Sequence, residues 1–324
     1  EFRRVLFRSA DVLRRDPLLD APLPEAIQRS IVETFGAPLT AGQVVARIIE
    51  DVRMQGDAAV RRYSQRFDGS ADAPMEVTEA EFDAAEGQVD AALLEAVEVM
   101  TARIRAFHAV QREHAPRPFV HAGLGMEVRP IGRAGIYMTG NIAVLPSSVV
   151  HTAVPAVVAG VPEVVGVTAA RPDGSVHPLK LVAARRAGVQ RVFRASGAQA
   201  LAALAYGTET IPRADKVFGP GNLFVTLAKQ QLYGQVGIDA LYGPTETLVL
   251  ADEHAAPDLC AADLLAQAEH DVLARPVLIT TTVQHAEAVA AEVERQLGII
   301  ERGAIARQAI QRGGAVVVDD LDVA

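Results

Sequence analysis

A regular alternation of short apolar runs and longer helical segments begins at Met126 and continues almost to the end of the chain. The apolar runs include MEVRPIG, GIYMTG, EVVGVTAA, RVFRAS and DKVFGPGN, and segments of helical period such as SSVVHTAVPAVVAG lie between them. Repeated strand and helix is typical of a parallel sheet with helices on its faces. The sequence therefore predicts an α/β fold.

The alternation falls into two blocks, about 131–245 and 246–324. The second block offers only TLVLADE, PVLITTT and GAVVVDD as strands, so we expect elements from elsewhere in the protein to complete its sheet. The period of residues 22–125 is mainly helical, with Thr40 as a helix N-cap candidate. A helical N-terminal region should therefore precede the sheets.

Composition excludes several classes of protein. Half of the 324 residues are apolar and the formal net charge is −9, which argues against a nucleic-acid or anionic-membrane surface. No apolar run reaches the roughly 18–20 residues of a membrane span. The single cysteine, Cys260, excludes an intrachain disulfide, and its apolar helical surroundings favour a buried thiol over a nucleophile. We expect a cytoplasmic protein without nucleic-acid or membrane partners.

Both ends of the chain are unusual. It begins EFRRVLFRSA without Met, and we interpret residues 1–21 as a non-native or disordered segment. It stops at VVVDDLDVA, which resembles a strand leading to a helix that does not follow. We therefore expect this chain to be a fragment of a longer protein.

Four glycine-containing loops are candidates for binding a ligand: MTGNIAVLPSS, RASGAQA, FGPGN and YGPTE. In open parallel sheets, ligands bind beyond the carboxyl ends of the strands, where glycine permits close approach and helix starts attract anions. The nearest match to GxGxxG, Gly219 to Phe224, lacks the third glycine and a following acid. Judged on spacing alone, Ser147 and Asn222 are better explained as helix N-caps than as ligand-binding residues.

Gln267 and His270 are three residues apart in a predicted helix and should share one face. Imidazole is a common zinc ligand, whereas an amide oxygen is an unusual one. Judged on spacing alone, ordinary surface polarity explains this pair better than a metal site. The other histidines show no ligand spacing, and the sequence supports no Ser-His-Asp or Cys-His arrangement.

Several of these segments, in this order, resemble the histidinol dehydrogenase family. They are RPIGRAGIYMTG, LPSSVVHTAVPAVVAGV, GAQALAALAYGTETIPRADKVFGPGN, the GPTE segment followed by LVLAD, and DLLAQAEH. Together they extend from about Arg129 to Asp271, with weaker likeness back to about Pro22 and on to the end. This long run of motifs turns the Gln267 and His270 pair into the expected metal site.

The resemblance implies an NAD-dependent, zinc-containing homodimer that oxidises L-histidinol through its aldehyde to L-histidine. Matching residue by residue gives NAD-binding positions, substrate positions and two zinc ligands. The NAD-binding positions are Tyr137, Gln199 and Asn222; the substrate positions are Thr245, Gln267 and His270; the zinc ligands are Gln267 and His270. At 245 the family usually has Ser, and Thr keeps the hydroxyl.

The implied fold consists of two intertwined Rossmann-like domains with parallel sheets flanked by helices. Residues 131–245 would form an NAD-binding domain inserted into a domain made of 22–130 plus 246–324. The family's catalytic Glu-His pair would lie beyond Ala324, so no catalytic acid or base is expected within this chain, and the fragment should be inactive.

The resemblance has one local departure. The family's glycine-rich loop after the tyrosine usually reads PGG, whereas this chain has Met138-Thr139-Gly140-Asn141 there. Two alternatives stay open: a zinc and NAD dehydrogenase of the same family acting on another small polar alcohol, and a fragment that binds a nucleotide without catalysis.

Overall fold

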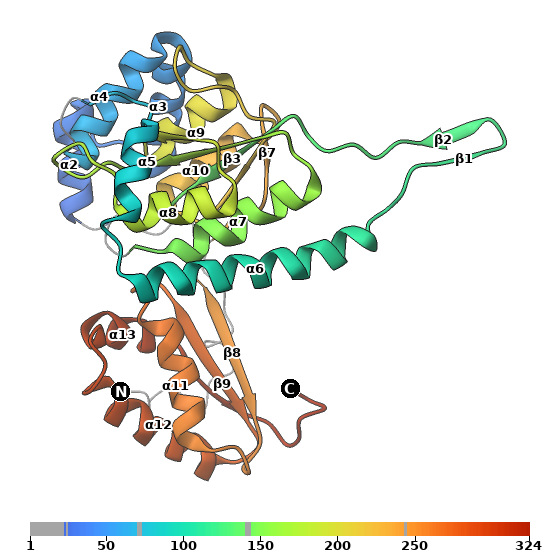
Figure 1. Ribbon diagram of the computed structural model, residues 1–324. Helices are drawn as coiled ribbons and strands as arrows, with labels where there is room; N and C mark the ends of the chain where they lie inside the picture. The colour runs from blue at the N-terminus through green and yellow to red at the C-terminus, as the bar shows by residue number, and fades with distance from the viewer. Residues whose placement is uncertain (1–22, 24, 70–72, 140–143, 243–244) are drawn as a thin grey trace. The chain divides into compact units, whose positions relative to one another are not determined.

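The computed structural model describes residues 23, 25–69, 73–139, 144–242 and 245–324. Parallel sheets flanked by helices, with a helical N-terminal region, confirm the predicted α/β fold (Figure 1). The chain divides into two compact units, 22–241 and 242–324. The N-terminal helices thus belong to the same unit as residues 131–241. The expected grouping of 22–130 with 246–324 stays a prediction about the complete protein.

The larger unit is built on a five-stranded sheet in the order β5-β4-β3-β6-β7, and all neighbouring strands are parallel. Its strands are β3 (Arg133–Tyr137), β4 (Glu163–Thr168), β5 (Arg191–Arg194), β6 (Lys216–Phe218) and β7 (Gly237–Ile238). The strand order reverses between β3 and β6. In open sheets of this kind, ligands bind at that reversal, beyond the carboxyl ends of the strands.

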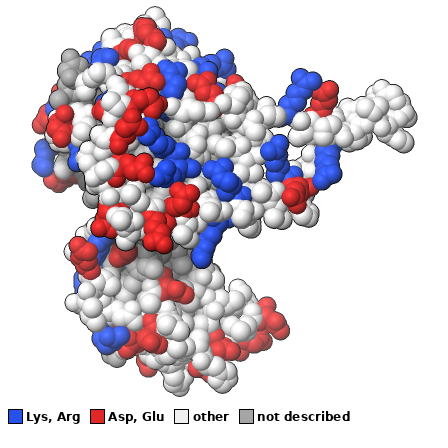
Figure 2. Space-filling model, viewed as in Figure 1, with Lys and Arg blue, Asp and Glu red and all other residues white. Residues whose placement is uncertain are grey.

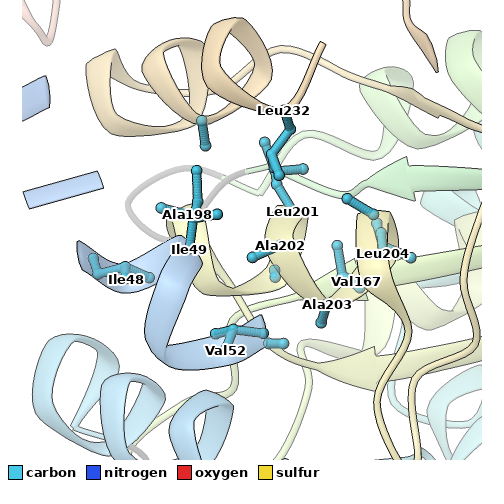
Figure 3. Close-up of a cluster of buried hydrophobic side chains, with 14 of the residues drawn as sticks. Ile48, Ile49, Val52, Val167, Ala198, Leu201, Ala202, Ala203, Leu204 and Leu232 are labelled. Atoms are coloured by element: carbon cyan, nitrogen blue, oxygen red, sulfur yellow. The ribbon is translucent and has the colours of Figure 1, made fainter. Parts of the chain in front are cut away.

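Helices pack against this sheet and form two hydrophobic clusters with it. The crossover helices are α7 (Pro146–Ala159), α8 (Pro178–Ala187), α9 (Gly197–Tyr206) and α10 (Leu223–Leu232). The N-terminal helices are α2 (Glu25–Phe35), α3 (Ala41–Gln55), α4 (Asp57–Asp68), α5 (Glu79–Glu86) and α6 (Ala91–Glu113). Figure 3 shows α3 packing through Ile49 and Val52 near Leu201 and Ala202 of α9. The N-terminal helices therefore supply part of the core of this unit.

The predicted cap at Thr40 is confirmed as a full capping box. The Thr40 hydroxyl accepts a hydrogen bond from the Gln43 backbone N–H at 3.3 Å, and the Gln43 side chain accepts from the Thr40 N–H at 2.9 Å. Two N–H groups that the helix leaves unpaired are thereby satisfied. This fixes the start of α3, which carries more buried residues than any other N-terminal helix of the described chain.

A β-hairpin interrupts the region expected to be mainly helical. β1 (Phe119–His121) and β2 (Leu124–Met126) pair antiparallel around Ala122 and Gly123, both of which have positive φ. The hairpin extends away from the sheet, and its outer part carries no charged side chain (Figures 1 and 2). Val120 is 84% and Leu124 78% exposed. This arm was not predicted.

The smaller unit contains a three-stranded parallel sheet in the order β10-β9-β8, as the three apolar runs predicted. The strands are β8 (Glu246–Ala251), β9 (Arg275–Thr280) and β10 (Gly314–Val317), and the helices are α11 (Pro257–Ala268), α12 (Val283–Leu297) and α13 (Gly303–Ile310). One sheet face packs on these helices around Leu264, Leu278 and Val289. Across the residues described, no helix is long and apolar enough to cross a membrane.

Candidate cofactor site and metal ligands

The larger unit brings the three predicted NAD-binding residues to one edge of its sheet. Tyr137 ends β3, Asn222 lies between β6 and α10, and Gln199 lies in the first turn of α9. The Gly197 backbone N–H donates to the Tyr137 hydroxyl oxygen at 3.0 Å, which ties the end of β3 to the start of α9. All three residues therefore lie around the carboxyl ends of the strands, where the sheet order reverses.

Tyr137 is suited to donating a hydrogen bond. Burial raises the pKa of its phenol to about 12, so the hydroxyl keeps its proton at physiological pH. The oxygen already accepts a hydrogen bond from Gly197. Its own O–H can still be directed to a ligand acceptor. A role as a general base does not fit this environment.

Gln199 has an unsatisfied donor. The side chain is only 1% exposed, and its Nε2 has no hydrogen-bond partner among the described residues. A buried N–H left without a partner costs about 1–3 kcal/mol. A ligand oxygen at this edge of the sheet would remove that cost.

The FGPGN turn approaches β3 too closely for any side chain. Gly219 has φ +119°, and a Cβ there would lie 2.5 Å from the Tyr137 carbonyl oxygen. Asp239 accepts from the Gly219 N–H at 2.8 Å, and Lys229 donates to Asp239 at 2.6 Å and to the Gly219 carbonyl. This buried ion pair holds the turn in place. Sequence spacing gave no indication of it, because Lys229 reads as an ordinary helix residue.

The two N-cap interpretations have different outcomes. The Asn222 side-chain oxygen accepts from the Val225 N–H at 3.2 Å, so Asn222 does cap α10. Ser147 lies inside α7, whose N-cap is Leu145 and whose first residue is Pro146, so its predicted cap is wrong. Proline takes the first helical position readily because it lacks the N–H. In the Met138–Asn141 loop, Gly140 and Asn141 lie outside the described residues.

In the smaller unit, Gln267 and His270 line one groove of about 510 Å³ together with part of β8. α11 ends at Ala268, so the prediction that both residues lie on one helix is wrong for His270. The turn after α11 still keeps them together, because the His270 N–H donates to the Gln267 carbonyl at 3.2 Å. Asp263, which sequence reasoning did not select, lines the same groove at helical spacing from Gln267.

Thr245 lies directly before β8, and its carbonyl accepts from the Arg275 N–H at 3.0 Å. The YGPTE loop therefore leads into β8, the strand that the run TLVLADE predicted, and unlike the other three candidate loops it does not lead into a helix start. The apolar run TLVLA explains this, because a strand begins there. α11 connects two parallel strands, so it runs back from the carboxyl edge of the sheet to the amino edge. The end of α11 therefore lies at the same amino edge as Thr245.

Gln267 and His270 fit part of a zinc site. Zinc in proteins usually has four ligands, of which imidazole nitrogen is among the commonest. Within the described ranges, no group of three or more His, Cys, Asp or Glu side chains is placed to hold a metal ion. Cys260 is not a candidate ligand, since it is buried and burial raises its thiol pKa. The pair supplies at most half of a tetrahedral set.

The reversal in strand order, the glycine turn against β3 and the helix starts at the carboxyl edge define a Rossmann-like α/β protein. The family model "Histidinol dehydrogenase" matches residues 38–324. The chain belongs to the histidinol dehydrogenase family, as the sequence motifs indicated.

Individual relatives agree with this assignment. Histidinol dehydrogenase from Deinococcus radiodurans is 51% identical over 280 residues, covering 85% of this chain and 63% of that protein. The Synechococcus sp. enzyme is 48% identical over 288 residues, covering 86% and 66%. The crystal structure of histidinol dehydrogenase from Elizabethkingia anophelis matches with a TM-score of 0.83 at 33% identity, covering 94% of this chain and 69% of that one. The chain spans less than two thirds of the first two relatives.

Proposed function

We propose that the protein to which this chain belongs oxidises L-histidinol to L-histidine through the aldehyde, with NAD as the hydride acceptor. The family membership supports this reaction. The observation that carries the cofactor half is the buried Gln199 amide, whose Nε2 has no described partner at the edge where Tyr137 and Asn222 also lie. A dinucleotide bound there would supply the missing acceptor.

NAD takes up a hydride in each of two successive oxidations. In this proposal the Tyr137 hydroxyl donates to the cofactor, since its raised pKa keeps it protonated. Gln199 donates through its amide. Asn222 caps α10 and so fixes the helix start, whose remaining N–H groups would face the cofactor. The Lys229–Asp239 pair holds in place the glycine turn that would face the cofactor.

For the substrate half, we propose that Gln267 and His270 hold zinc together with ligands that the described residues do not supply, and that Thr245 contacts the substrate. Bound zinc would hold the amino and imidazole groups of the substrate, which positions the alcohol without activating it directly. The shared groove of Gln267 and His270 supports this assignment.

For this 324-residue chain we propose cofactor binding without turnover. Two ligands hold zinc weakly, and no group of three or more His, Cys, Asp or Glu side chains among the described residues is placed to hold a metal ion. Purified chain supplied with zinc, NAD and L-histidinol should form no NADH. Zinc-dependent NADH formation would contradict this proposal.

Calorimetric titration with NAD tests the cofactor site directly. We expect Gln199→Ala to weaken NAD binding by about tenfold, the effect of losing one buried hydrogen bond to the ligand. Gln111→Ala, in an exposed position of α6, is the matched control and should bind NAD like the unaltered chain. Equal affinity of all three proteins would exclude Gln199 from the site.

We also propose a cytoplasmic homodimer. The uncharged hairpin of β1 and β2 supports dimerisation, because isolated two-stranded hairpins are marginally stable and its apolar residues are largely exposed. Analytical ultracentrifugation should show a dimer that Val120→Lys dissociates, whereas Val99→Lys, on the exposed side of α6, leaves it intact. A monomer at all concentrations would refute the dimer for this chain.

A further inference from the structure

A buried lysine side chain lies beside the end of β4. The NAD contacts proposed above give this lysine no role. Lys180 of α8 is 2% exposed, and its Nζ donates to the Thr168 hydroxyl at 2.9 Å. Thr168 is the last residue of β4 and donates in turn to the Met138 carbonyl at 3.1 Å. The ammonium group therefore lies at the carboxyl edge of the sheet, beside the end of β3.

A carboxylate from the N-terminal helices lies at the same edge of the sheet. Asp68 ends α4, and both of its carboxylate oxygens accept from the Ser196 hydroxyl, at 2.8 and 2.7 Å. Ser196 directly precedes Gly197, which donates to Tyr137. Asp68 is thus joined through two residues to the candidate cofactor site.

The two charges interact although these described side chains form no direct ion pair. Burial lowers the pKa of Lys180 to about 8, and the Asp68 charge opposes that shift. Burial raises the pKa of Asp68, and the Ser196 hydroxyl and the Lys180 charge oppose it. The ammonium retains donor capacity, and the carboxylate retains lone pairs.

Ordinary dinucleotide-binding sheets place an acid at the end of the strand next to the first one, where it accepts from the adenosine ribose 2′-hydroxyl. In this sheet that strand is β4, which ends Thr168-Ala-Ala without an acid. Asp68 is a carboxylate that the structure brings to this edge beside Ser196, and its charge also affects Tyr137.

We propose that Asp68 and Lys180 bind the adenosine ribose of the dinucleotide, and that Asp68 thereby selects NAD over NADP. This inference rests on the proposed NAD site. A ribose hydroxyl can donate to the carboxylate and accept from the ammonium. A 2′-phosphate can only accept, and its negative charges would face Asp68. The acid missing from β4 is thus supplied by the N-terminal helices.

Binding of NAD, 2′-deoxy-NAD and NADP to the unaltered chain tests this without a substitution. We expect 2′-deoxy-NAD to bind about tenfold more weakly than NAD, because a hydrogen bond to a charged group is lost. NADP should bind more weakly still. If 2′-deoxy-NAD binds as tightly as NAD, the ribose contact does not exist and the inference is overturned.

Asp68→Asn identifies the residue, since the amide keeps an acceptor for Ser196 but removes the charge. We expect it to weaken NAD binding about tenfold and to reduce the difference in affinity between NAD and 2′-deoxy-NAD. The ratio of NAD affinity to NADP affinity should also fall. Lys180→Met should weaken the binding of NAD without strengthening the binding of NADP. Asp83→Asn removes an exposed carboxylate of α5 and should keep all three affinities. Circular dichroism checks that each variant is folded.

The outcomes separate the inference from the function on which it rests. If the unaltered chain binds neither NAD nor NADP, the proposed cofactor site fails and the ribose assignment falls with it. If NAD binds and Gln199→Ala weakens it, but Asp68→Asn leaves the preference for NAD unchanged, the cofactor site stands and only the Asp68 assignment is overturned.

Discussion

The two units of the chain hold their candidate residues in opposite ways. In the larger unit, Tyr137 and Gln199 are buried, and partners from distant parts of the sequence fix the backbone around them. In the smaller unit, His270 and Thr245 are exposed, and Gln267 is only partly buried. The candidate cofactor residues are therefore held in place by the fold, whereas the candidate metal ligands lie in an exposed groove of their own unit.

The difference follows from how each sheet is covered. Five parallel strands with helices in two clusters bury the carboxyl edge of the larger unit. In the smaller unit, helices cover one face of three strands, and Leu248 and Leu250 of β8 remain about half exposed. Parallel sheets are normally covered on both faces. The surroundings of Gln267 and His270 are therefore less constrained than those of Gln199.

A matched pair of leucine truncations tests this contrast most strongly. Leu201→Ala in α9 removes a side chain that is 1% exposed, and we expect a loss of about 3–4 kcal/mol in the stability of the larger unit. Leu248→Ala removes one that is 53% exposed and should cost less than about 1 kcal/mol. Hydrogen exchange resolved by peptide reports each unit separately.

Similar losses at the two positions would show that β8 is covered as completely as α9. The contrast between a closed and an open unit would then fail. A small loss at both positions would instead show that the core around Leu201 repacks, which Ile49→Ala in the same cluster would test independently.

The buried charge of Lys180 gives the larger unit a pH dependence that the smaller one should lack. The Lys180 pKa is lowered to about 8 from an ordinary value of 10.5, mainly by burial. Between these values the unfolded chain holds more protons than the folded one, so stability rises as pH increases. Relative to Lys180→Met, the unaltered chain should gain up to about 3 kcal/mol from pH 8 to 10.5.

Denaturant unfolding of both proteins at several pH values measures this gain. Taking the difference between them cancels groups common to both, including Tyr137, whose raised pKa makes stability fall above its ordinary value of 10.0. A difference that does not change between pH 8 and 10.5 would mean that Lys180 is not held as a buried cation.

The strand and helix pattern selected the loops at the edge of the sheet that carries the cofactor candidates, and the family resemblance supplied Tyr137, Gln199 and Asn222 within or beside those loops. Sequence alone could not predict Asp68, whose partner Ser196 is 128 positions away and joined to it only by the folding of α4. Spacing also cannot distinguish a helix that ends at Ala268 from one that continues to His270. The hairpin was missed because its two strands are short and Ala122 is not a typical residue for positive φ.

The smallest effect on stability should come from His270, which is exposed and lies in a turn after α11. We expect His270→Ala to change the unfolding free energy by less than about 0.5 kcal/mol.

The same substitution should weaken zinc binding by about tenfold or more, because the imidazole is the stronger ligand of the pair. Competition with a chromophoric zinc chelator measures the affinity. His254→Ala is the matched control, since that side chain is 83% exposed and does not line the groove. Equal zinc affinity of both variants would remove His270 from the metal site. A large loss of stability would instead mean that the smaller unit depends on its candidate ligands as the larger one does, and the contrast between them would disappear.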